Sequence, residues 1–127
     1  IVFITHDFDE AIRLADRIAI MKDGEIIQVG SPEELVIRPA TDYVAEFTRD
    51  VNRARVLSAR SLMGAATAKT ENGERIAAAA KVDSFAARII EANRPFAVVD
   101  GDGRIIGEIS PRAVIDLFSG RDRARSP

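Results

Sequence analysis

The first eleven residues, IVFITHDFDEA, constrain the fold more than any other stretch of the sequence. The apolar residues 1–4 predict a short β-strand that is buried on both faces. A polar break of Thr5, His6 and Asp7 follows, and an amphipathic helix begins at once. Strands buried on both faces usually have neighbours that β-α-β units supply, so we expect an α/β fold. Because most of such a sheet is missing from this sequence, we interpret the chain as the tail of a larger protein.

His6 lies at the position where a ligand would meet the expected strand. In open α/β sheets, ligands bind beyond the carboxyl ends of the strands, in the loops that lead into helices. His6 is also the only histidine of the chain. A lone histidine often has a structural role, but this position makes His6 a candidate catalytic residue. The adjacent Asp7 is better suited to be a helix N-cap than a catalytic base.

Residues 18–48 carry a succession of turn and capping signals. Two β-rich runs flank Asp23-Gly24, which predicts a hairpin. Ser31, Pro32 and Glu34 then predict a capped helix with a capping box. Residues 42–48 predict a further short helix. Its expected buried side chains are Tyr43, Val44 and Phe47.

Residues 49–60, RDVNRARVLSAR, contain four arginines and one aspartate, and we interpret them as a linker. One interpretation is a solvated basic helix or connector. The other is a contact with anionic lipid headgroups or with an acidic partner surface, which clustered arginines could provide.

Residues 61–120 predict a second α/β segment with the order β-α-β-β-α. Two short β-runs are expected around the turn at residues 71–74, followed by a helix over 84–93 that Asp83-Ser84 would cap. A second hairpin is expected around Asp102-Gly103, and Ser110-Pro111 would open the last helix. That helix would bury Ala113, Val114, Leu117 and Phe118. Residues 121–127, RDRARSP, predict a disordered tail.

Composition excludes several classes of function. The chain has no cysteine, so disulfides and thiolate metal sites are excluded, and no His/Cys cluster predicts a metal site. A net charge of −2 gives the molecule no strong preference for nucleic acid, which we do not expect as a partner. No apolar run approaches the roughly 18 residues that span a bilayer.

The motifs of the first 48 residues resemble the last segment of an ABC-transporter ATPase domain. These motifs are the strand, THD, the pair Glu10-Ala11, LADRIAIM, KDGEI and GSPEEL, and the match begins at the switch-histidine loop. The continuation PATDYVAEF is similar to the importers for glycine betaine, proline and related quaternary amines. The resemblance implies that residues 1–48 are the C-terminal edge of such a domain.

In that family the histidine at the position of His6 reaches the γ-phosphate of ATP bound across an ATPase dimer. The resemblance therefore implies ATP and Mg²⁺ as cofactors of a full-length parent. The chain has no G-x-x-x-x-G-K-[ST] loop to hold phosphates. We thus expect this polypeptide alone to bind no cofactor firmly and to be inactive.

The run PFAVVDGDGRIIGEIS resembles a CBS motif, placed at residues 61–120. The resemblance implies a possible ligand cleft at Gly107, Ile109 and Ser110, although Ala113 stands where the family has an aspartate for ribose. Such motifs pair, so we expect a homodimer that would cover Val98, Ile105 and Ile109.

The function that these resemblances imply is ATP hydrolysis for osmoregulatory import of a quaternary amine, with a CBS regulatory module. The implied partners are a transmembrane permease and an extracytoplasmic substrate-binding protein. The implied location is peripheral, on the cytoplasmic face of the membrane. The alternative is a non-enzymatic, homodimeric CBS module that senses a small ligand.

Overall fold

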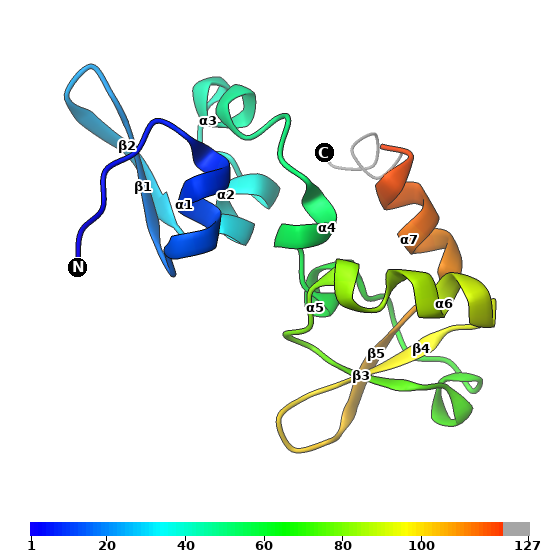
Figure 1. Cartoon of the computed structure of the whole chain (residues 1–127). Helices are drawn as coiled ribbons and strands as arrows, with labels where there is room; N and C mark the ends of the chain where they lie inside the picture. Colours follow the sequence, from blue (N-terminus) through cyan, green and yellow to red (C-terminus); the bar gives the residue numbers. More distant parts are fainter. Residues whose placement is uncertain (121–127) are drawn as a thin grey trace. The chain divides into compact units, whose positions relative to one another are not determined.

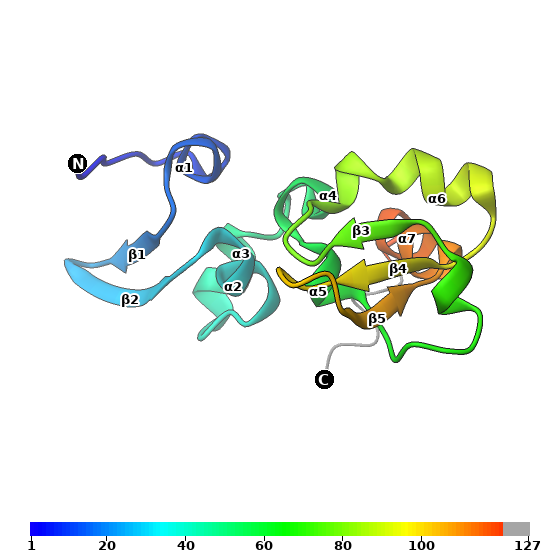
Figure 2. The same ribbon diagram turned by 90° about the horizontal axis from the view of Figure 1, so that it is seen from below.

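The computed structural model of the chain describes residues 1–120. The chain divides into two compact units, Ile1–Val56 and Leu57–Pro127. Figures 1 and 2 show the helices and strands of both units. The tail predicted to be disordered, residues 121–127, lies outside the described residues.

The first unit combines a β-hairpin with short helices. Its elements are α1 (Phe8–Leu14), β1 (Ile18–Lys22), β2 (Glu25–Gly30), α2 (Pro32–Ile37), α3 (Asp42–Phe47) and α4 (Arg53–Val56). Its core is made of side chains from β1, from the four helices and from the segment before α4, namely Phe8, Ile18, Ile20, Leu35, Val36, Val44, Val51, Ala54 and Val56.

The hairpin and the α2 cap form as predicted. Asp23 and Gly24 both have positive φ, at 53° and 80°, which allows the tight turn between β1 and β2. Ser31 accepts a hydrogen bond from the backbone N–H of Glu34, and the Glu34 carboxylate accepts one from the backbone N–H of Ser31. The Gln28 side chain also joins β2 to the loop after α2, because it donates to the carbonyl of Arg38 at 2.9 Å.

Two predictions for the first unit are wrong. Residues 1–4 form no strand and are exposed, because a lone strand has no neighbour to satisfy its backbone groups. In α3 only Val44 is buried, whereas Tyr43 and Phe47 remain partly exposed. Phe47 instead packs edge-on against Phe8, with their ring centroids 5.6 Å apart.

The linker predicted at residues 49–60 contains folded structure. Helix α4 and the start of α5 (Ala59–Leu62) lie within this range, and Val51, Ala54 and Val56 are buried. The division between the two units falls after Val56. The linker boundaries themselves stay a prediction.

The second unit is a three-stranded sheet with α-helices on one face, as Figure 1 shows. Strand β3 (Arg75–Ala77) pairs with β4 (Phe96–Val99) in parallel, and β4 pairs with β5 (Ile105–Ile109) antiparallel. The order β3-α6-β4-β5-α7 has the β-α-β-β-α pattern predicted for residues 61–120. The elements are α5 (Ala59–Leu62), the 3₁₀ turn η1 (Thr70–Asn72), β3 (Arg75–Ala77), the 3₁₀ turn η2 (Val82–Ser84), α6 (Ala86–Ala92), β4 (Phe96–Val99), β5 (Ile105–Ile109) and α7 (Pro111–Phe118).

Several local predictions for the second unit are corrected. Of the two β-runs expected around the turn at residues 71–74, only the second forms, as β3; residues 65–69 form no helix or strand, and η1 overlaps the expected turn. Asp83 and Ser84 do not cap α6, because the Ser84 hydroxyl donates to the carbonyl of Lys81 and both residues lie in η2. Phe118, expected inside, is 58% exposed, since the face of α7 that is buried is centred on Val114 and Leu117.

The expected burial of β-strand residues by a second copy of the chain is also corrected. Val98 and Ile109 were expected to need a partner chain, yet both are 0% exposed within the unit itself. Ile105 is partly buried. The edge of β5 is covered by Gly64, whose N–H and carbonyl both bond the backbone of Glu108. A partner chain is therefore not required to bury Val98 and Ile109.

Candidate functional site

The turn around His6 is held by hydrogen bonds on both of its sides. The Thr5 hydroxyl donates to the Glu10 carboxylate at 2.7 Å and accepts from the backbone N–H of Asp7 at 3.0 Å. The Asp7 carboxylate accepts from the backbone N–H groups of Asp9 and Glu10. Asp7 is thus the N-cap of α1, as predicted.

The His6 side chain is exposed. Among residues 1–120, no residue forms a hydrogen bond or ion pair with its imidazole. Phe8, two residues after His6, is buried and anchors α1 in the first unit. An anchored loop with an exposed imidazole can present an N–H donor to an incoming phosphate oxygen.

The three residues predicted for a ligand cleft are engaged by the fold. Ile109 is fully buried, and the Ser110 hydroxyl accepts from the backbone N–H of Ala113 at 3.1 Å as the N-cap of α7. A Cβ atom at Gly107 would lie 2.7 Å from the Gly64 carbonyl and 2.7 Å from the Met63 sulfur. Their role in ligand binding stays a prediction.

Glu108 is a chemically notable residue that the sequence did not reveal. Its carboxylate accepts a short hydrogen bond from the hydroxyl of Thr70, which is 1% exposed, and a second one from Thr67 at 3.0 Å. The Thr70 bond is the main cause that lowers the pKa of Glu108; desolvation opposes it, and Thr67 and Lys69 assist it. The partners lie 38 and 41 residues away along the chain, so no local motif could signal the contact.

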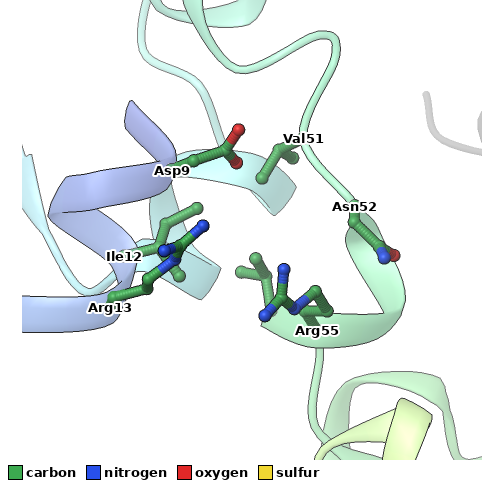
Figure 3. Close-up of a pocket in the computed structure, with 7 residues that line it drawn as sticks. Asp9, Ile12, Arg13, Val51, Asn52 and Arg55 are labelled. Atoms are coloured by element: carbon green, nitrogen blue, oxygen red, sulfur yellow. The ribbon is translucent and has the colours of Figure 1, made fainter. Parts of the chain in front are cut away.

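Two surface cavities also escaped sequence reasoning. One of about 260 Å³ lies in the second unit and is lined by Lys69, Asn72, Gly73, Arg94 and Pro95. The other, of about 210 Å³, lies in the first unit between α1 and α4 and is shown in Figure 3. The arginine-rich run at residues 49–60 could have indicated the cavity in the first unit, since Arg55 lines it.

Residues 1–120 contain no group of three or more His, Cys, Asp or Glu side chains that could hold a metal ion. Within the same residues, no helix has both the length and the apolar character needed to cross a bilayer.

Known proteins match the chain along nearly its whole length. It is 40% identical over 123 residues to the trimethylamine N-oxide transport system ATP-binding protein TmoW of Pelagibacter ubique (strain HTCC1062), an alignment that covers 97% of this chain. It is 43% identical over 118 residues to the protein of the same name from Ruegeria pomeroyi, which covers 93% of this chain. The chain is thus similar to transport ATP-binding proteins over nearly its whole length.

Alignments that are shorter but have higher identity occur with related transport proteins. The chain is 51% identical over 73 residues to the glycine betaine/proline betaine transport system ATP-binding protein ProV of Escherichia coli (strain K12), which is 58% of this chain and 17% of the relative. The resemblance to ABC-transporter ATP-binding proteins that the motifs of residues 1–48 predicted is thus confirmed. The chain spans about a third of the length of the TmoW proteins, 36% and 34% respectively. No protein-family model matches the chain.

Proposed function

We propose that this chain is part of the ATP-hydrolysing subunit of an ABC importer for glycine betaine, proline or a similar quaternary amine. The observation that carries the proposal is the 40% identity with a transport ATP-binding protein in an alignment that covers 97% of the chain. The exposed His6, held in its loop by Thr5 and Asp7, is consistent with this role.

In this proposal His6 is the catalytic residue that the chain contributes. Phosphoryl transfer depends mainly on positioned donors and on stabilisation of developing charge, rather than on covalent chemistry with the protein. His6 would donate a hydrogen bond to the γ-phosphate of ATP, which would arrive with Mg²⁺ and be held by residues of the full-length protein. The 127 residues lack a phosphate-binding loop, so they should hydrolyse no ATP by themselves.

The proposed protein works with partners at a membrane. A permease subunit would carry the solute across, and an extracytoplasmic binding protein would deliver it. The ATP-binding subunit would lie peripherally on the cytoplasmic face.

The second unit is proposed to be a CBS-like regulatory module. Its β-α-β-β-α order and its own core, which includes Phe85, Phe96 and Ile109, support this assignment. We propose that two copies pair through the exposed side chains of α6 and α7, which include Ile90, Ile115 and Phe118. The paired modules would then bias closure of the ATPase dimer.

Substitution of His6 tests the proposed catalytic role. In the full-length protein, His6→Ala should lower the rate of ATP hydrolysis by about 10²-fold or more, because a positioned donor to the phosphate is lost. ATP binding, measured by equilibrium titration with a fluorescent ATP analogue, should persist. The exposed Arg17 offers a control, and Arg17→Ala should hydrolyse ATP at the normal rate. Normal turnover of the His6 variant would contradict the assignment.

A non-enzymatic sensor is the second candidate. The observation that favours it is the cavity of about 260 Å³ beside Lys69 and Arg94, within a unit that has its own core. A full-length gene that encodes a phosphate-binding glycine loop before residue 1 would decide for the ATPase.

A further inference from the structure

The cavity in the first unit is bounded by helices that are distant in sequence. Its lining comes from α1 and from the segment that leads into and forms α4. Val51 and Val56 are buried and Ile12 is partly buried, so part of the wall is apolar. The lining residues are Asp9, Ile12, Arg13, Val51, Asn52, Arg55 and Val56.

Two arginines reach this cavity from opposite sides. Figure 3 shows the guanidinium groups of Arg13, on α1, and Arg55, on α4, both directed into the space between the two helices. Neither forms an ion pair within residues 1–120, although Asp9 lies one turn before Arg13 on the same helix. With Asp9 included, the lining residues carry a formal net charge of +1.

Elsewhere in the chain, several arginines have an acidic partner. Arg49 pairs with Glu46 at 3.2 Å, and Arg88 pairs with Glu74 at 3.1 Å. Two guanidinium groups that face one cavity repel each other, and they do so more strongly beside apolar walls than in open water. A bound anion would remove that repulsion.

We propose that this cavity binds a phosphate-type oxyanion between Arg13 and Arg55. The planar fork of a guanidinium donates two parallel hydrogen bonds to phosphate oxygens, and two such forks can share one tetrahedral anion. The ligand class is inorganic phosphate or a small phosphomonoester. His6, which is proposed to contact the γ-phosphate, does not line this cavity.

The bound anion would join two parts of the first unit. Helix α1 begins two residues after His6, and α4 is the last element of the unit. An oxyanion held by both helices would stabilise the unit and the loop that positions His6.

The test is a titration of the 127-residue chain, monitored by the Nε–Hε resonances of its arginines. Inorganic phosphate is added at constant ionic strength, with chloride as the balancing anion. The expected result is a saturable shift of the Arg13 and Arg55 resonances. Arg55→Gln should weaken binding by about tenfold or more, because one charge-assisted donor group is removed. Arg17→Gln makes the same change of charge outside the cavity and should leave the affinity unchanged.

A second arm distinguishes the source of the phosphate group. Adenosine monophosphate binding more tightly than inorganic phosphate identifies a phosphomonoester site, and equal affinity identifies a site for the free ion. Both results support the proposal.

Three results would overturn it. The first is a shift that does not saturate and is shared by all arginines, and the second is an equal loss of affinity in the Arg17 and Arg55 variants. The third concerns the variant Arg55→Lys, which keeps the positive charge and is the control for misfolding. Its amide spectrum should match that of the unmodified chain, and its affinity should fall because the bidentate contact is lost. Unchanged affinity in this variant would also contradict the proposal.

Discussion

Glu108 fastens a segment of irregular structure to the sheet of the second unit. Its carboxylate accepts hydrogen bonds from the hydroxyl groups of Thr67 and Thr70, and its backbone pairs with that of Gly64. Both hydroxyls donate, so they stabilise the ionised carboxylate and not the protonated one. The lowered pKa of Glu108 therefore makes its contribution to stability dependent on pH.

The sign of this dependence follows from the direction of the pKa shift. The stabilisation is fully present above the pKa of a glutamate in the unfolded chain, about 4.3, and it is lost as the pH falls through the lower folded pKa. In urea unfolding, the difference in free energy between the unmodified chain and Glu108→Gln should be largest at neutral pH and should shrink below about pH 4. Thr70→Val, which removes the main donor, should reduce the same pH-dependent difference. A difference that stays constant from pH 7 to pH 3 would refute the role of this carboxylate.

At the level of single residues, sequence reasoning succeeds where the chemistry is local. Asp7 and Ser31 cap helices that begin immediately after them, so their roles follow from spacing alone. Glu108 and Arg55 depend on partners from distant parts of the chain. Without knowledge of packing, a glutamate in a strand and an arginine in a basic run predict only solvated side chains.

Strand β5 and the segment before η1 show how closely elements can approach where a side chain is absent. Gly107 lies in β5 and faces Met63 and Gly64 at a distance that leaves no room for a methyl group. Gly101, in the turn between β4 and β5, has no atom near its would-be Cβ and no positive φ. The two glycines therefore form a matched pair.

Gly107→Ala should destabilise the chain by about 1–3 kcal/mol, because the added methyl group forces backbone and side-chain shifts in a packed contact. Gly101→Ala should change the free energy of unfolding by about 0.5 kcal/mol or less in either direction. Thermal and urea unfolding of both variants measure the difference. Equal stability of the two variants would show that Met63 and Gly64 do not pack against β5 in solution.

Hairpins and capped helices were predicted from sequence more accurately than the remaining elements. The turns at Asp23-Gly24 and Asp102-Gly103 carry their own signal, and the strands on either side form. The helix after Asp83-Ser84 starts later than predicted, because a 3₁₀ turn uses both residues first. The strand at residues 1–4 does not form, since a strand depends on neighbours that its own sequence does not contain.

At the level of the whole molecule, the chain consists of two compact units, each with its own buried side chains. The division after Val56 gives a natural position for truncation. If the second unit is regulatory, its removal should leave ATP hydrolysis unchanged and should abolish only the response of transport to osmolality.

A full-length protein shortened after Val56 should still hydrolyse ATP and drive uptake in reconstituted vesicles together with its permease. Uptake should no longer rise with the osmolality of the medium, because the proposed sensing module is absent. The untruncated assembly serves as the control. Transport that responds equally in both assemblies would exclude a regulatory role for the second unit.

The exposed residues 1–4 have a practical consequence for handling this polypeptide. Their side chains are apolar and exposed, and they have no strand neighbour in the described residues, so their unpaired backbone groups are available to pair with a second copy of the chain. Solutions of the 127-residue chain should therefore become turbid with time and with rising concentration, as the chains associate through residues 1–4. A lysine-rich extension joined ahead of residue 1 should keep the polypeptide dispersed, because like charges would oppose stacking.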